Sequence, residues 1–136
     1  MAFTSTQKIR FDDVDGAGIV YYPQFFHLCH KAFEDFFDDT ASVSYPHLIA
    51  DMRRGFPAVA IESQFLSPLK YGDTAIVRVE VDSVGGSSVK FRYRIHRKRD
   101  SVLCFEACVT KVFMNLDTGK SEQLSGEIRS LLEGMV

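Results

Sequence analysis

The stretch PQFFHLCHKAFEDFF, residues 23–37, decides the fold because its apolar side chains recur with the period of an α-helix. Pro23 suits the first helical position, since its missing N–H has no intrahelical partner there. Phe26 and Phe37 widen the apolar stripe beyond what one side of a surface helix needs. We therefore predict a long central helix that is wrapped on several sides and ends near Asp39. The stripe itself consists of Phe25, Leu28, Cys29, Ala32, Phe33 and Phe36.

From Phe56 onward the apolar residues alternate with a period of two, which predicts β-strands. Gly85-Gly86 is a hairpin signal, and residues 89–96 after it alternate between an apolar and a polar face. Residues 103–114 are largely apolar on both faces, which predicts a strand in the interior of a sheet. We expect an α+β fold in which an antiparallel sheet of about five strands wraps around the central helix.

Three shorter elements are predicted around this frame. Residues 8–11 alternate polar and apolar side chains, which indicates a half-buried strand before a turn-rich stretch. A short helix is expected between Pro46 and Arg54, with Gly55 as the residue that closes it. The apolar residues after Ser125 indicate a short helix near the C-terminus.

The composition is that of one soluble globular domain, and we assign residues 1–136 to it. A net charge of -2 argues against a nucleic-acid partner and against binding to an anionic membrane surface. No apolar run approaches the roughly 20 residues of a membrane helix. The 12 phenylalanines require either a thick core or a large subunit interface.

The cysteines point to a reducing compartment. Cys29, Cys104 and Cys108 are odd in number and form no CxxC pair, and no secretory signal pattern precedes them. We therefore expect free thiols and a cytoplasmic protein.

Carboxylates gather in a glycine-containing turn directly before the central helix, in the stretch Phe11 to Pro23. Unpaired N–H groups at a helix N-terminus can polarise a carbonyl, and a nearby carboxylate can act as a nucleophile or as a general base on water. Those are the parts that thioester hydrolysis requires. From the residues alone, turn-forming or helix-capping roles for Asp13 and Asp15 are favoured over catalysis, because Asp is common in such turns.

This stretch resembles the 4-hydroxybenzoyl-CoA thioesterase family, whose members have the hotdog fold. The family's pattern is a strand, then F-x-D-x-D-x-x-G-I-V-x-Y, then the central helix. The positions are filled by Phe11, Asp13, Asp15, Gly18, Ile19, Val20 and Tyr22. A second block, residues 57–59 and 65–73, resembles the family's second strand and its tight turn, so the resemblance spans nearly the whole chain.

The resemblance implies an acyl-CoA thioesterase that hydrolyses an acyl-CoA to a carboxylic acid and CoA without a cofactor. It implies that Asp15 is the catalytic carboxylate, as nucleophile or general base, and that the backbone amide of Tyr22 polarises the thioester carbonyl. It also implies a homodimer that joins two sheets edge to edge, with sites at the subunit interface, and often a homotetramer. The residues expected to bind substrate are Gly18, Tyr21, Pro23, His30, Ser87 and Ser88.

The chain departs from the family at two places. Some members carry a basic cluster that meets the CoA phosphates in a hairpin, but the corresponding turn here, residues 85–88, is uncharged. Arg97, Lys98, Arg99 or a neighbouring subunit are the alternatives, and an acyl carrier protein stays open as the carrier of the acyl group. His30 stands where the hydroxybenzoyl branch has an Asp, so the acyl group recognised here is expected to differ.

Other readings of the polar residues are less favoured. His27 and His30, with Glu34 one turn beyond, have the spacing of metal ligands, but no further strong ligand is identifiable and we expect no metal. A calcium loop that begins at Asp13 lacks the acid expected at its last position. Glu62 is expected to be an ordinary strand residue.

Two functions from other classes remain as alternatives to the hydrolase. A hotdog dehydratase or isomerase acting on acyl-CoA would have an Asp-x4-His pairing, which is absent after Asp13 and Asp15. A non-catalytic acyl-CoA-binding module would have no need of the carboxylate at Asp15.

Overall fold

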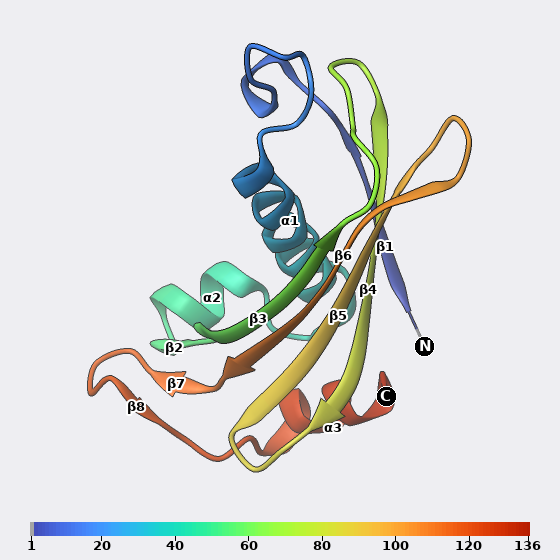
Figure 1. The fold of residues 1–136 in the computed structure, drawn as a ribbon. Coiled ribbons are helices and arrows are strands. Elements are labelled where there is room, and N and C mark those ends of the chain that lie inside the picture. The colour runs from blue at the N-terminus through green and yellow to red at the C-terminus, as the bar shows by residue number, and fades with distance from the viewer. Residues whose placement is uncertain (1) are drawn as a thin grey trace.

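The computed structural model describes residues 2–136, which form one long helix, two short helices and two antiparallel sheets, one of them small (Figure 1). The helices are α1 (Tyr22–Thr40), α2 (Tyr45–Ala50) and α3 (Gly126–Gly134), with a 3-10 turn, η1, at Phe11–Asp13. The strands are β1 (Phe3–Lys8), β2 (Arg54–Gly55), β3 (Ala58–Phe65), β4 (Thr74–Val84), β5 (Ser88–Arg97), β6 (Val102–Val112), β7 (Met114–Asn115) and β8 (Lys120–Ser121).

Five strands form the main sheet in the order β1-β4-β5-β6-β3, and every neighbouring pair is antiparallel. Strands β4, β5 and β6 follow one another as a meander, while β1 and β3 occupy the two edges. A small sheet of β2, β7 and β8 lies beside α2 (Figure 1). The predicted α+β architecture, with about five antiparallel strands around a central helix, is confirmed.

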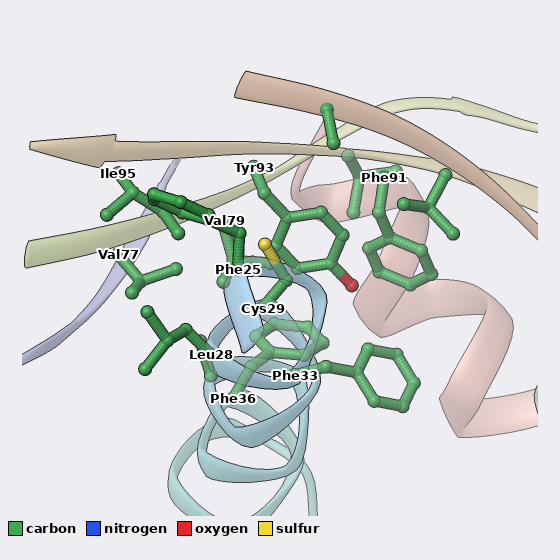
Figure 2. Close-up of a cluster of buried hydrophobic side chains, with 14 of the residues drawn as sticks. Phe25, Leu28, Cys29, Phe33, Phe36, Val77, Val79, Phe91, Tyr93 and Ile95 are labelled. Carbon is green, nitrogen blue, oxygen red and sulfur yellow. The ribbon is translucent and has the colours of Figure 1, made fainter. Parts of the chain in front are cut away.

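Helix α1 lies in the concave face of the sheet, and its apolar stripe packs against the inward side chains of β4, β5 and β6 (Figure 2). Phe33 meets Phe91 edge to face, with ring centroids 5.2 Å apart, and Phe25 stacks on Phe105 at 4.9 Å. Every residue of the predicted helical stripe is buried. Apolar contacts on several sides of α1 therefore fix its position, as the width of the stripe predicts.

The phenylalanines mostly fill this core. Eight of the 12 are buried within the chain, and only Phe11 and Phe65 are largely exposed. Strand β5, which carries the alternating residues 89–96, is the middle strand of the sheet. Of the two edge strands β3 is the more exposed, because all eight of its residues are exposed.

Two predicted elements are wrong in their boundaries. The strand expected at residues 8–11 ends at Lys8, because the Asp13 carboxylate accepts the Arg10 N–H at 2.8 Å and the chain turns into η1. Gly55 does not close α2: it lies in β2, where an added Cβ would meet Leu116 Cδ2 at 3.1 Å. The left-handed residue near that turn is Arg53, with φ of 56°.

The other predicted elements are confirmed. Residues 85–87 connect β4 to β5, β6 has a neighbour on each side, and α3 follows Ser125. None of the helices in the described part of the chain is both long and apolar enough to cross a membrane.

Candidate active site

A short loop between η1 and α1 carries Asp15 at its tip. Its two arms are held together by a bridge between Val14 and Val20 and by the Asp15 N–H, which donates to the Ile19 carbonyl at 3.1 Å. The Gly18 N–H closes the turn by donating to the Asp15 carbonyl at 2.9 Å. Gly18 has φ of 79°, a left-handed conformation that glycine adopts without steric cost.

The two aspartates of the motif have different surroundings. The Asp15 carboxylate is exposed; its Oδ1 accepts the Ala17 N–H at 2.8 Å, and its Oδ2 has no partner among residues 2–136. Asp13 is 6% exposed, and its carboxylate accepts the Arg10 N–H. Asp13 therefore holds the local backbone, whereas the Asp15 carboxylate keeps an oxygen available for chemistry.

Helix α1 begins at Tyr22, two residues after the loop closes, and no side chain caps its N-terminus. The Tyr21 N–H donates to the Asp13 carbonyl at 3.0 Å and the Val20 N–H to the Leu69 carbonyl at 2.8 Å. Pro23 brings no N–H at the second helical position. Within residues 2–136 the Tyr22 N–H has no acceptor, so it is a free donor beside the Asp15 loop.

An apolar cavity of about 340 Å³ opens beside this donor. Tyr22 and Phe65 meet edge to face with ring centroids 6.3 Å apart, and Phe25 and Phe65 do so at 5.6 Å. Asp15 itself does not line the cavity. The lining residues are Ile19, Val20, Tyr22, Phe25, Phe65, Leu66, Ser67 and Pro68. A larger hollow of about 830 Å³, between the end of α1 and α3, lies at the other end of the helix.

Half of these lining residues, those from Phe65 to Pro68, are not predicted from the sequence to be part of the site. Phe65 to Pro68 belong to the second block of resemblance, but their sequence only indicates the end of a strand. Their position beside Tyr22 depends on long-range hydrogen bonds, such as that from Val20 to Leu69.

His30 lies about two turns further along α1 and is not part of the cavity wall. Its Nε2 is 2.8 Å from Glu34 Oε2, and its ring contacts Phe33 and Tyr45. Burial and then the positive charge of Lys111 lower the pKa of His30, while Glu34 opposes the shift. The imidazole is thereby favoured in its neutral form.

Ser87 and Ser88 do not lie near Asp15 within one chain. Ser87 ends the β4–β5 turn and Ser88 begins β5, whereas the Asp15 loop contacts the residues that precede β4, at the opposite end of the same strands (Figure 1). Ten residues of β5 separate the two ends by roughly 30 Å.

The remaining polar groups offer no second centre for this chemistry. Burial raises the pKa of the Cys29 thiol to about 12, which disfavours a thiolate nucleophile there. Across residues 2–136 no cluster of three or more His, Cys, Asp or Glu side chains has the arrangement of a metal site. Glu62 is an exposed residue of the edge strand β3.

Known proteins match this chain over almost its full length. A 1,4-dihydroxy-2-naphthoyl-CoA hydrolase from Nostoc punctiforme is 26% identical over 133 residues, which cover 98% of this chain and 88% of that protein. The structure of a 1,4-dihydroxy-2-naphthoyl-CoA thioesterase from Synechocystis superposes with a TM-score of 0.87 at 24% identity, covering 97% of this chain and 96% of that one.

A variant of 4-hydroxybenzoyl-CoA thioesterase, solved with 4-hydroxybenzoyl-CoA, superposes with a TM-score of 0.87 at 21% identity and covers 96% of this chain and 98% of its own. These superpositions confirm the hotdog fold. The thioesterase-like superfamily matches residues 9–132. The protein therefore belongs to the thioesterase-like superfamily of hotdog-fold proteins.

Proposed function

We propose that this protein hydrolyses an acyl-CoA thioester to a free carboxylic acid and CoA, with Asp15 as the catalytic carboxylate. One observation carries the proposal: an exposed carboxylate with a free oxygen stands on the turn that leads directly to the unpaired N–H of Tyr22. Membership of the superfamily and the names of its relatives, which are CoA hydrolases and thioesterases, support the same reaction.

In this proposal the Tyr22 N–H donates to the thioester carbonyl oxygen and stabilises the negative charge that develops on it during attack. Asp15 either removes a proton from the attacking water or attacks the carbonyl carbon itself, in which case water then cleaves the acyl-enzyme. In both routes the C–S bond breaks and CoA leaves as its thiol or thiolate. Both routes require the Asp15 carboxylate in its charged form.

The acyl group is proposed to be aromatic. The cavity beside Tyr22 is lined by three aromatic side chains and by aliphatic ones, which suits a flat apolar group. The relatives' names are consistent with this, since the Nostoc protein acts on 1,4-dihydroxy-2-naphthoyl-CoA. Gly18, Tyr21 and Pro23 would shape the passage to the cavity, and His30 would contact substrate from further along α1.

The working form is proposed to be a homodimer paired through the β3 edges, with a homotetramer as a further assembly. Every residue of β3 is exposed, including the apolar Val59, Ile61 and Phe65. An unpaired apolar edge of this kind favours association with a second copy. Antiparallel pairing of two β3 strands would turn the partner's hairpin toward this chain's Asp15 loop. The partner's Ser87 and the partner's Ser88 would then line the pantetheine path that they cannot reach within one chain.

We place the protein in the cytoplasm, as one domain over residues 1–136. The three cysteines are free thiols in the structure, which fits a reducing compartment.

A panel of aryl, short-chain and long-chain acyl-CoAs, followed by thiol release and by product analysis, tests the reaction. We expect release of free CoA with an aromatic acid as the best product. Dehydration or isomerisation of the acyl chain without CoA release would support a hotdog dehydratase or isomerase instead. Tight binding of the whole panel without any turnover would support a binding module.

A further inference from the structure

The exposed aromatic side chains of residues 2–136 all gather at the Asp15 end of the molecule, in two groups. Tyr22 and Phe65 line the acyl cavity, and the Tyr21 ring packs against the Tyr22 ring. Phe11 and Tyr71 form a separate edge-to-face pair, with centroids 5.9 Å apart and exposed fractions of 77% and 60%. The thioester chemistry makes no use of this second pair.

A hollow of about 560 Å³ lies beside the Phe11 and Tyr71 rings, and Lys8, Ile9, Arg10, Asp12 and Gly72 complete its lining. It is joined directly to the catalytic loop. The Tyr71 N–H donates to the Gly18 carbonyl at 3.4 Å, and Asp13, which follows Phe11 in η1, accepts the Tyr21 N–H at its carbonyl. The hollow is at the β1 and β4 side of the sheet, away from the β3 edge.

Arg10 is unusual among the arginines. Eight of the nine form an ion pair with Asp or Glu, whereas the Arg10 guanidinium has neither an ion pair nor a hydrogen bond among residues 2–136. Arg10 and Lys8 also border a second hollow of about 670 Å³, which adds Lys31 and Lys98. No carboxylate lies within ion-pair distance of these four cations in the described part of the chain.

The acids of the second hollow are engaged elsewhere. Asp35 accepts the Ser5 hydroxyl at 2.6 Å, Asp38 accepts the Tyr45 N–H at 3.1 Å, and Glu34 pairs with His30. Asp12 is the one acid in the lining of the first hollow, against Lys8 and Arg10. Free cations beside exposed aromatic rings suit a ligand that combines a flat heteroaromatic ring with phosphate groups.

We propose that the hollow beside Phe11 and Tyr71 binds the adenosine 3′,5′-bisphosphate end of coenzyme A, with the adenine against the two rings and a phosphate on Arg10 and Lys8. This inference rests on the proposed function for the identity of the ligand. It supplies the phosphate contacts that the uncharged turn at residues 85–88 lacks. It also selects CoA over an acyl carrier protein, whose phosphopantetheine carries no adenosine.

Calorimetric titration with adenosine 3′,5′-bisphosphate tests the site without relying on catalysis. Wild type is expected to bind it, and Arg10→Met, Phe11→Ala and Tyr71→Ala are each expected to bind it about 10-fold more weakly or worse. Arg78→Met, which removes an exposed arginine on the outer face of β4, is the matched control and should bind like wild type. Thermal melting of each variant checks that it is folded.

A hydrolysis assay tests the nucleotide site and the proposed reaction separately. In wild type, kcat/KM should be higher for an acyl-CoA than for the matching acyl-pantetheine. In Arg10→Met the ratio of these two kcat/KM values should fall toward one. Absence of bisphosphate binding by wild type, or equal affinity in wild type, Arg10→Met and Tyr71→Ala, would overturn the nucleotide site while hydrolysis of acyl-pantetheine still supported the thioesterase. Failure to hydrolyse either thioester, with bisphosphate binding intact, would overturn the reaction and leave the nucleotide site standing.

Discussion

The Tyr21 N–H donates a 3.0 Å hydrogen bond to the Asp13 carbonyl, while the Asp13 carboxylate accepts the Arg10 N–H at 2.8 Å. One residue thus fastens both ends of the segment that carries Asp15, and Asp13 is 6% exposed. The first acid of the motif holds the backbone, and the second is left free at the tip of the loop.

Asp13→Ala is therefore expected to lower the free energy of unfolding by about 1–2 kcal/mol, because it removes a capping acceptor and leaves the Arg10 N–H without one. Asp12→Ala, in the same turn but exposed, is the control and should change stability little. Urea denaturation measures both. Equal stability of Asp13→Ala and wild type would show that the carboxylate has no structural role.

Gly18→Ala is expected to destabilise the protein by about 1–2 kcal/mol, since an alanine at φ of 79° incurs the steric cost of the left-handed conformation. An added Cβ meets no atom within 4 Å at either Gly18 or Gly16, so Gly16→Ala is a matched control that differs in backbone conformation. Thermal melting of the two variants checks the prediction. Equal losses of stability in Gly18→Ala and Gly16→Ala would contradict the prediction.

Lys111 gives stability a dependence on pH. It is 6% exposed, its Nζ lies 3.5 Å from the centroid of the Phe33 ring, and burial lowers its pKa from 10.5 to about 8. Between these two pH values the unfolded chain holds a proton that the folded chain has lost, so this residue makes the free energy of unfolding rise with pH. The rise has a limit of about 3 kcal/mol.

Lys111→Met should lack this rise and should be at least as stable as wild type at pH 7, where the buried cation is costly. Cys29 acts in the opposite sense, because its pKa of about 12 makes stability fall above pH 9, but it is present in both proteins. The difference between wild type and Lys111→Met, measured by urea denaturation from pH 7 to 10.5, isolates the lysine. A difference that does not vary with pH would contradict the prediction.

The proposed dimer depends on the edge of β3. Ile61→Lys should convert the dimer to monomers and reduce hydrolysis, because it places a charge on an apolar surface that the partner would bury. Met52→Lys, an exposed apolar residue in the turn after α2, is the control and should remain dimeric. Light scattering coupled to gel filtration gives the mass. A wild-type monomer, or a dimeric Ile61→Lys, would move the interface elsewhere.

The frame of the fold is readable from the sequence where periodicity and burial coincide. The stripe from Phe25 to Phe36 is long enough to define α1, and Gly85-Gly86 marks the hairpin between β4 and β5. Residues 8–11 mislead because a polar-apolar alternation cannot reveal that Asp13 will take the Arg10 N–H and end the strand. Gly55 misleads because its small size serves contact with Leu116 rather than a left-handed turn.

The site is predictable only in part for a similar reason. The motif places Asp15 and Tyr22 only seven positions apart in the chain, so their proximity is local. Half of the cavity lining, Phe65 to Pro68, comes from residues some 45 positions away in the sequence. Long-range hydrogen bonds such as Val20 to Leu69 at 2.8 Å hold this segment in place, and no short sequence pattern encodes them. The sequence also cannot reveal that Arg10 lacks an ion pair among residues 2–136. That depends on the ion pairs of the other eight arginines, which form only in the folded chain.

The central claim is that Asp15 performs the chemistry, and the most direct measurement compares kcat for the best acyl-CoA between Asp15→Asn and Asp12→Asn. The amide keeps the shape and the Ala17 hydrogen bond but cannot act as nucleophile or base, so Asp15→Asn should lose at least about 100-fold in kcat while Asp12→Asn stays near wild type. An Asp15→Asn protein that turns over within a few-fold of wild type would contradict the assignment.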